Sequence, residues 1–329
     1  MSNIVADPYA ACTDDPGDTG REAVAYDAIL AHISPRNEVR RLLPHKVRRM
    51  VGAWCFVDVY GPEQVTSGPG MSVPPHPHMG LQTVSWLVQG RVVHRDSLGT
   101  TAQVVPGRAA LMTAGRGIAH SENSPPAGER PSRLQGVQLW VALPSWARDR
   151  EPAFQLSAPA PVVQLDALQA TVFMGSLARV AAPAQAVTPL LGAELTPAAV
   201  PPSGKARAGT LPVDPAYEHL LVPLDGEARV AGVRVATGQA VYLGTHRTSL
   251  EVELSAGGRA LLLGGEPFTE ELVMWWNFVG RSHEEIVAAR QAWNAGSARF
   301  GEVAHYPGPE RLVAPELPNV RLRPRGRVS

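Results

Sequence analysis

Residues 75–90 of this chain are PHPHMGLQTVSWLVQG, in which two histidines precede an apolar run that ends at a glycine. His76 and His78 occupy alternate positions, and residues i and i+2 of a β-strand point to the same face of a sheet. The run from Thr83 to Val88 is rich in β-branched and aromatic residues, which favour strands. The stretch therefore predicts a strand end that presents two imidazoles to one side, followed by a second strand.

Residues 112–122, MTAGRGIAHSE, repeat this arrangement, with His120 and Glu122 in alternate positions after a glycine turn. Imidazole nitrogens and carboxylate oxygens are ligands of borderline divalent metals. Either pair alone could occur by chance in a solvated loop. Two such pairs, each beside a strand pattern, instead predict one four-ligand metal pocket between two facing strands.

Short apolar runs separated by turn residues continue along the chain, and the 31 glycines and 31 prolines suit many short strands. In the first half we expect strands at residues 51–60, 83–88, 91–95, 102–105, 109–113 and 137–143. In the second half we expect them at residues 171–175, 190–195, 219–224, 227–230, 239–243, 249–254 and 259–263. This rhythm is typical of sandwiches and barrels, and the two runs suggest two copies of one architecture.

The remaining segments are assigned from local composition. Residues 1–35 should form an N-terminal tail, mobile up to about residue 20, and a short helix from Arg21 to Ile33. The proline-rich residues 152–161 indicate a domain boundary, and residues 195–212 resemble a loop. The predicted domains are therefore a metal-binding β-domain at residues 36–150, a second β-domain at residues 165–280 and a helix with a tail at residues 281–329.

The C-terminal helix carries a start signal. Ser282 and Glu285 form a capping box, in which each side chain can satisfy a backbone N–H of the first turn. Ile286, Ala289 and Trp293 would then form one buried stripe. The basic tail that follows, with Arg321, Arg323, Arg325 and Arg327, is expected to be solvated and disordered rather than bound to nucleic acid.

Composition narrows the class of protein. Thirty basic and thirty acidic residues cancel, so no overall field attracts nucleic acid or an anionic membrane. No apolar run approaches the ~20 residues of a membrane span, and the first fifteen residues carry three carboxylates but no basic side chain, unlike a signal peptide. Cys12 and Cys55 do not indicate a disulfide framework. We therefore expect a cytoplasmic protein, monomeric, with neither a membrane nor a direct nucleic-acid partner.

Other candidate residues have a structural and a functional interpretation. For His94 a hydrogen-bonded structural role is favoured over that of a fifth ligand, and Arg116 either faces the pocket mouth or braces its turn. Trp86, Leu111 and Met112 are favoured as barrel core over pocket wall. His283 has a glutamate two positions on, but at a helix start, where residues i and i+2 do not share a face. The second β-domain is therefore expected to lack a metal.

On these residues the chain resembles the pirins, bicupin members of the cupin superfamily. The resemblance covers roughly residues 36–305 and rests on the two histidine stretches together with HRDSLG (94–99), GVQLWVALP (136–144) and GGEPF (264–268). It implies an all-β fold of two stacked jelly-roll barrels with a short C-terminal helix. It also implies one metal in the first barrel, usually iron, held in pirins by three histidines and one glutamate. In this chain those ligands would be His76, His78, His120 and Glu122.

The same resemblance suggests two functions. Some pirins resemble quercetin 2,3-dioxygenases, which implies oxygenolytic opening of a flavonol or similar aromatic enol. Fe(II) would be the cofactor, with other divalent transition metals as substitutes, and Glu122 would be both ligand and catalytic base. The alternative is a non-catalytic, iron-dependent regulator that binds a transcription factor or a metabolic enzyme. Met79 and Gln82 stand where pirins often have arginine and glutamate.

Overall fold

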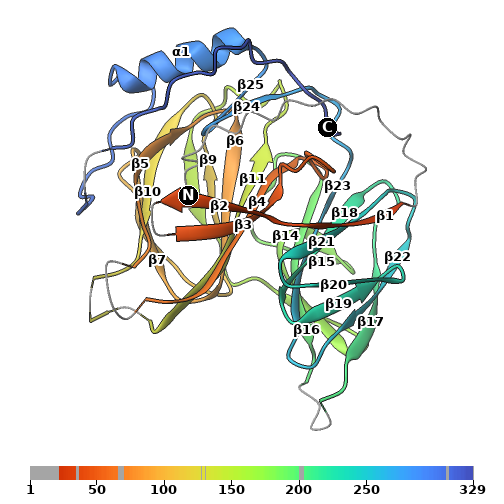
Figure 1. Cartoon of the computed structure of the whole chain (residues 1–329). Coiled ribbons are helices and arrows are strands. Elements are labelled where there is room, and N and C mark those ends of the chain that lie inside the picture. The colour runs from red at the N-terminus through yellow and green to blue at the C-terminus, as the bar shows by residue number, and fades with distance from the viewer. Residues whose placement is uncertain are drawn as a thin grey trace.

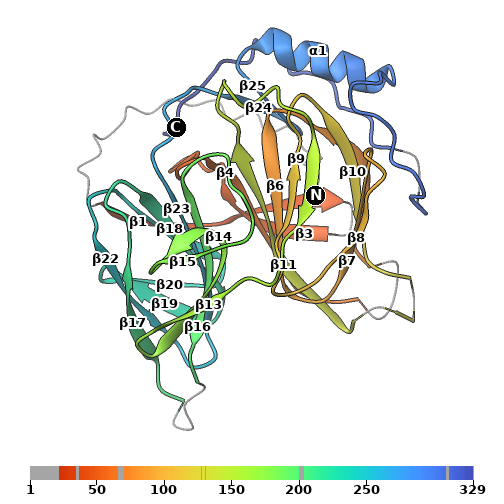
Figure 2. The same cartoon turned by 180° about the vertical axis from the view of Figure 1, so that it is seen from behind.

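The computed structural model describes residues 22–34, 37–65, 70–126, 128–129, 131–199, 204–308 and 311–328; the expected tail at residues 1–20, with Cys12, lies outside them. The described residues form 25 strands and one helix. Figures 1 and 2 show two β-barrels side by side, with the helix lying across one end of the first barrel. The all-β bicupin prediction is thereby confirmed.

The first barrel consists of two antiparallel sheets. One has four strands in the order β5 (Ser72–His78), β10 (Ile118–Asn123), β7 (Val92–Asp96) and β8 (Thr101–Val104). The other has seven, in the order β12 (Ala153–Leu156), β9 (Ala110–Thr113), β6 (Leu81–Gln89), β11 (Arg133–Ala142), β4 (Trp54–Gln64), β3 (Asn37–Leu43) and β2 (Ile29–Ser34).

The second barrel repeats this plan. Its smaller sheet has the order β17 (Arg207–Pro212), β22 (Ser249–Leu254), β19 (Glu227–Val230) and β20 (Val233–Ala236). Its larger sheet has the order β1 (Ala23–Asp27), β21 (Gln239–Leu243), β18 (Glu218–Asp225), β23 (Arg259–Gly265), β16 (Leu190–Pro197), β14 (Leu168–Leu177) and β13 (Val162–Leu165), with β15 (Val180–Ala181) paired to β14. Apart from one edge strand each, the strand orders correspond, so the two barrels are copies of one architecture.

The helix expected from Arg21 to Ile33 is wrong. The described part of this stretch forms β1 and β2, which pair with β21 of the second barrel and with β3 of the first. The distant strand β21 stabilises β1 and the neighbouring strand β3 stabilises β2, so strand pairing, which a short segment cannot signal, overrode the local propensity. For the same reason residues 207–212 form β17 in a stretch expected to be a loop, and residues 153–156 form β12 within the expected domain boundary.

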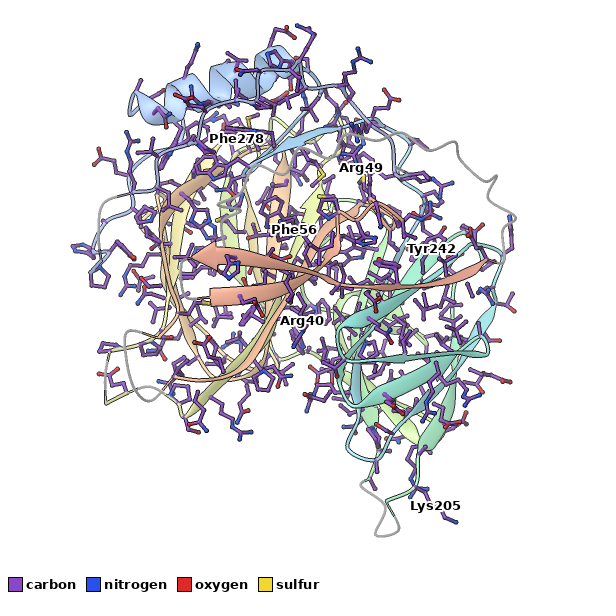
Figure 3. The ribbon with its side chains drawn as sticks, in the orientation of Figure 1. Arg40, Arg49, Phe56, Lys205, Tyr242 and Phe278 are labelled. Atoms are coloured by element: carbon purple, nitrogen blue, oxygen red, sulfur yellow. The ribbon has the colours of Figure 1, made fainter. Side chains whose placement is uncertain are left out.

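The two barrels share a continuous apolar core between their larger sheets. The Trp86 ring stacks on Phe173 of the second barrel, with 4.8 Å between ring centroids, and its Nε1 donates to Glu194 Oε2 at 2.5 Å. Trp86, Leu111 and Met112 all belong to this buried cluster, so their interpretation as core is right. Figure 3 labels Phe56 of the first barrel and Tyr242 of the second, and both side chains belong to the shared cluster.

The end of the chain folds back over the first barrel as a cap, defined here as residues 272–308 and 311–328. It contains β24 (Val273–Trp275), β25 (Phe278–Gly280) and α1 (His283–Asn294), and Figure 3 places Phe278 beneath the helix. The Ser282 half of the predicted capping box is present, because Ser282 Oγ accepts from the Glu285 N–H at 3.2 Å. The Glu285 carboxylate accepts from the Arg281 N–H at 2.9 Å, one residue before the expected donor. The predicted stripe of Ile286, Ala289 and Trp293 is buried.

The prediction of a solvated tail is only partly right. Arg321 and Arg323 are exposed. Arg325, in contrast, forms a β-bridge with Leu272, and Arg327 forms an ion pair with Glu218 at 2.7 Å. Among the described residues, no helix is long and apolar enough to cross a membrane.

Candidate metal centre

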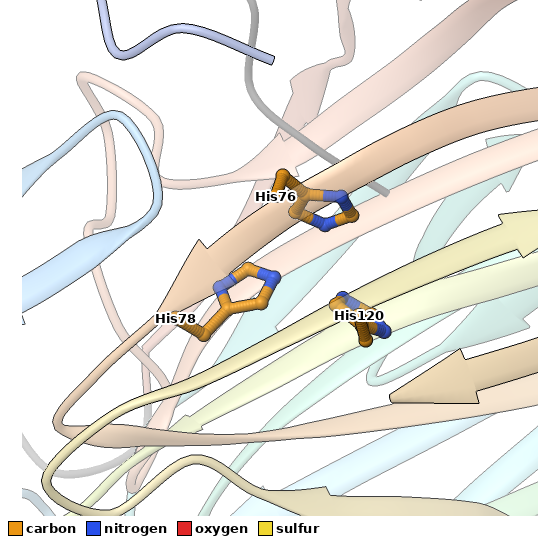
Figure 4. Close-up of side chains that lie close together, drawn as sticks. All are labelled: His76, His78 and His120. Atoms are coloured by element: carbon orange, nitrogen blue, oxygen red, sulfur yellow. The ribbon is translucent and has the colours of Figure 1, made fainter. Parts of the chain in front are cut away.

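Strands β5 and β10 bring three imidazoles together, as Figure 4 shows. The two strands are antiparallel, with His76 opposite His120 and His78 opposite Ile118. One ligand nitrogen from each of His76, His78 and His120 lies within 4.8 Å of the other two. The alternate spacing read from the sequence thus corresponds to one shared face, and all three side chains are buried.

The ring nitrogens of these histidines are used in a uniform way. His76 Nδ1 lies 2.9 Å from the Pro74 carbonyl and His78 Nδ1 lies 3.2 Å from the Asn277 carbonyl. A carbonyl oxygen only accepts, so each Nδ1 carries the proton and each Nε2 keeps its lone pair. The Nε2 atoms of His76, His78 and His120 are buried without a hydrogen-bond partner. Since a buried polar atom without a partner is costly, three converging lone pairs fit a bound divalent cation.

Burial also selects the protonation state that metals require. It lowers the pKa of His76 and His78 well below the usual histidine value. Burial, together with the neighbouring His76 and His78, does the same to the pKa of His120. The imidazoles are therefore neutral near pH 7, which is the form that coordinates a metal.

Glu122 adjoins the three imidazoles without belonging to their group. It is 2% exposed, and β10 has an irregularity of register against β5 between His120 and Glu122. Its Oε1 accepts from the Ser85 hydroxyl at 3.1 Å. The set of mutually close ligand atoms contains the imidazoles alone. The role of Glu122 as the fourth ligand remains a prediction.

A polar row crosses the larger sheet beneath Glu122 and was not predicted. Arg41 pairs with Asp58, Asp58 lies opposite Gln138, and Gln138 lies opposite Ser85. Ser85 Oγ is 2.8 Å from Gln138 Oε1, so its single proton serves either Gln138 or Glu122 at a given moment. The sequence contained an indication of this polar row, because Ser85 and Gln138 interrupt the apolar runs of their strands.

His94 lies beside the imidazoles on β7 and is hydrogen-bonded, in agreement with its expected structural role. Its Nε2 is 3.0 Å from Asp96 Oδ2, its Nδ1 is 3.4 Å from His120 Nδ1, and its ring stacks on Phe154. Burial alone would raise the pKa of Asp96, but the hydrogen bond from His94 and those from the Thr100 and Leu98 N–H groups hold it below the usual range. Asp96 is thus ionised and faces His94.

The surroundings of the ligand strands are set by residues far away in sequence. The Asn277 carbonyl that orients His78 comes from the turn between β24 and β25, where Trp276 has φ +51°. Gly80, which follows the first pair, has φ +72°, and the Val279 carbonyl leaves no room there for a Cβ. Arg116 forms an exposed ion pair with Glu151 and so braces its turn. The sequence around Asn277 contains no pattern that would have predicted its contact with His78.

The second barrel carries different side chains at the corresponding positions. Strands β17 and β22 correspond to β5 and β10 in strand order. Here Leu211 lies opposite Leu250, and Gly209 lies opposite Val252. Leu211, Leu250 and Val252 belong to the buried apolar cluster of the second barrel. That this barrel binds no metal remains a prediction, now with a physical reason.

Comparison with known proteins gives matches over both barrels. The family model Pirin matches residues 36–141, and the model Pirin C-terminal cupin domain matches residues 204–301. A Pseudomonas aeruginosa protein named as a candidate quercetin 2,3-dioxygenase is 46% identical over 280 residues, which are 85% of this chain and 86% of that protein. A pirin-like protein of Caulobacter vibrioides is 32% identical over 278 residues, 82% of this chain and 92% of its own length.

Among solved structures, a crystal structure of quercetin 2,3-dioxygenase from Acinetobacter baumannii has the same fold. It superposes with a TM-score of 0.85 at 37% sequence identity. The match covers 92% of this chain and 97% of that chain.

Proposed function

Because this chain belongs to the pirin family, we propose that its divalent metal is Fe(II) and that it is a dioxygenase of the quercetin 2,3-dioxygenase type, acting on flavonols or related aromatic enols. The observation that carries the proposal is the convergence of three buried Nε2 lone pairs beside a buried carboxylate. The activity in the names of the Pseudomonas and Acinetobacter proteins supports the substrate class.

The donor set is compatible with iron, and the reaction with dioxygen favours it over metals without redox chemistry. His76, His78 and His120 would hold the metal through Nε2, and Glu122 would complete the set with a carboxylate oxygen. Imidazole suits iron, nickel, copper and zinc alike, so geometry and availability decide between them. Iron, when bound, would supply Lewis acidity and the redox chemistry that a reaction with dioxygen needs.

Glu122 carries the proton chemistry in this proposal. A flavonol hydroxyl must lose its proton before the ring can be opened by dioxygen, and an adjacent carboxylate can accept it. When the Ser85 hydroxyl donates to Glu122 Oε1, rather than to Gln138, it restrains the orientation of the carboxylate. The neutral imidazoles cannot perform this role while their Nε2 lone pairs bind the metal.

Oxygen consumption by iron-loaded protein with quercetin tests the proposal. Glu122→Gln keeps an oxygen that can coordinate but accepts a proton poorly, so turnover should fall by ~10² or more while iron content falls less. Glu151→Gln is the matched control, because Glu151 forms only an exposed ion pair with Arg116, and it should behave like the wild type. Equal turnover in Glu122→Gln and wild type would remove Glu122 from catalysis. No oxygen uptake by fully loaded wild type, with several flavonols and catechols, would favour the regulatory protein instead.

A further inference from the structure

We propose that Asp96 and His94 form a hydrogen-bonded relay to His120 that fixes which nitrogen of His120 is free for the metal. In this relay Asp96 and His94 are positioning residues, and neither is a ligand. The inference rests on the metal-binding part of the proposed function and is independent of the reaction.

Strand register and burial place the side chains of Asp96, His94 and His120 on one buried face of the sheet. On β10 and β7, His120 lies opposite Asp96 and Glu122 lies opposite His94, so the polar side chains of both strands share one face. His94, Asp96 and His120 are each at most 3% exposed. The Phe154 ring stacks on His94 at 4.2 Å between centroids and 18° between planes, which holds the imidazole in its plane.

Proton positions along this relay follow from its hydrogen-bond geometry. The two Nδ1 atoms of His94 and His120 lie 3.4 Å apart and share one hydrogen bond, so one donates and the other accepts. His120 Nε2 is buried without a partner, which fits a lone pair kept for the metal, so the proton of His120 is on Nδ1. His94 Nδ1 is then the acceptor, and the ring N–H of His94 is at Nε2, where it donates to Asp96 across the 3.0 Å contact.

The relay has an electronic consequence as well. A histidine whose N–H donates to a carboxylate is a more basic ligand, and such partners usually change metal affinity by 10- to 100-fold. Here the carboxylate reaches His120 through a second imidazole. His76 and His78 donate only to neutral carbonyls, so the relay makes His120 the electronically distinct ligand of the three.

Asp96→Asn tests the relay without disturbing the turn. Asp96 Oδ1 accepts from the Leu98 and Thr100 N–H groups at 2.9 and 3.1 Å. The amide oxygen of the variant keeps both bonds, so its NH₂ faces His94 Nε2. His94 must then carry its proton on Nδ1, where it meets the Nδ1–H of His120. His120 then either carries its proton on Nε2, where the metal needs a lone pair, or loses its hydrogen bond to His94. Either outcome weakens the metal site.

The measurement is Co(II) titration of the metal-free protein, with nitrogen-15 spectra of the histidine rings as the second readout. We expect a Co(II) dissociation constant about 10- to 100-fold higher in Asp96→Asn, with a changed protonation pattern at His120. Asp166→Asn is the control, because exposed Asp166 also accepts a backbone N–H, from Thr210 at 2.9 Å. Its Co(II) affinity and His120 spectrum should be those of the wild type.

Two results separate the inference from the proposed function. Asp96→Asn with wild-type affinity and an unchanged His120 spectrum would overturn the relay. Wild-type protein that takes up no Co(II) would instead contradict the metal site, and the His120 spectrum of metal-free protein would still decide the relay. In that spectrum, a proton on His120 Nε2 in the wild type would also overturn it.

Discussion

At the scale of single residues, the candidate metal centre depends on the hydrogen-bond partner of each imidazole Nδ1. Each Nδ1 is engaged, by the Pro74 carbonyl, the Asn277 carbonyl or His94, and each Nε2 is buried without a hydrogen-bond partner. The His-x-His and His-x-Glu spacings could be read from the sequence because a strand's alternation is local. The orienting partners could not all be read. His94 and Asp96 have the same alternate spacing, whereas Asn277 is 199 residues from His78 and lies near it only through the fold.

A buried histidine outside the centre gives a residue-scale prediction. His219 is fully buried, neither ring nitrogen has a hydrogen-bond partner, and burial, with a smaller contribution from Arg247, lowers its pKa to about 4. In the unfolded chain the pKa is about 6.5. Below that pH the unfolded state binds a proton that the native state excludes, so stability is lost as the pH falls from about 6.5 towards 4.

Urea unfolding of metal-free protein measures this effect. His219 should contribute a loss of about 2 kcal/mol between about pH 7 and pH 5. His219→Leu removes the titrating group and should show a correspondingly smaller loss over the same interval. An identical pH dependence in both proteins would show that His219 is not the group responsible.

At the scale of elements, the helix was predictable and the N-terminal strands were not. The Ser282 cap of α1 and the buried stripe of the helix are both local patterns, and both are present. The pairing of β1 with β21 joins residues more than two hundred positions apart, and β2 pairs with a different barrel. Strands of five or six residues take their stability from such partners, so their own sequence carries little signal.

The helix start gives an element-scale prediction. Ser282 Oγ accepts from the Glu285 N–H, so Ser282→Ala leaves that donor without its cap and should cost about 1 kcal/mol of unfolding free energy. Ser282→Thr keeps a hydroxyl at the same position and should cost less. Urea midpoints of the three proteins give the comparison, and a Ser282→Ala midpoint equal to that of the wild type would exclude a stabilising cap.

At the scale of the whole molecule, a buried carboxylate joins three parts of the chain. Glu218 of β18 is fully buried and accepts from the Gly52 N–H at 2.7 Å and from the Tyr242 hydroxyl at 2.9 Å. Arg327 of the C-terminal cap forms the ion pair with the same side chain. The similar rhythm of the two sequence halves predicted two barrels, but it could not reveal that the tail passes between them.

Loss of this ion pair should destabilise the molecule. Arg327→Ala leaves a buried carboxylate without its countercharge, which should cost about 3 kcal/mol. Arg321→Ala is the control, because Arg321 lies in the same tail and forms an exposed ion pair with Glu284, whose removal should leave the unfolding midpoint unchanged. Equal unfolding midpoints for the two variants would show that the ion pair of Arg327 with Glu218 does not stabilise the molecule.

Anomalous diffraction at the iron edge, from crystals of iron-loaded protein, tests the metal centre most directly. We predict one peak per chain, about 2.0–2.3 Å from the Nε2 atoms of His76, His78 and His120 and from a carboxylate oxygen of Glu122. A chain without a peak at the three imidazoles, or with its peak among residues 170–270 of the second barrel, would contradict the account.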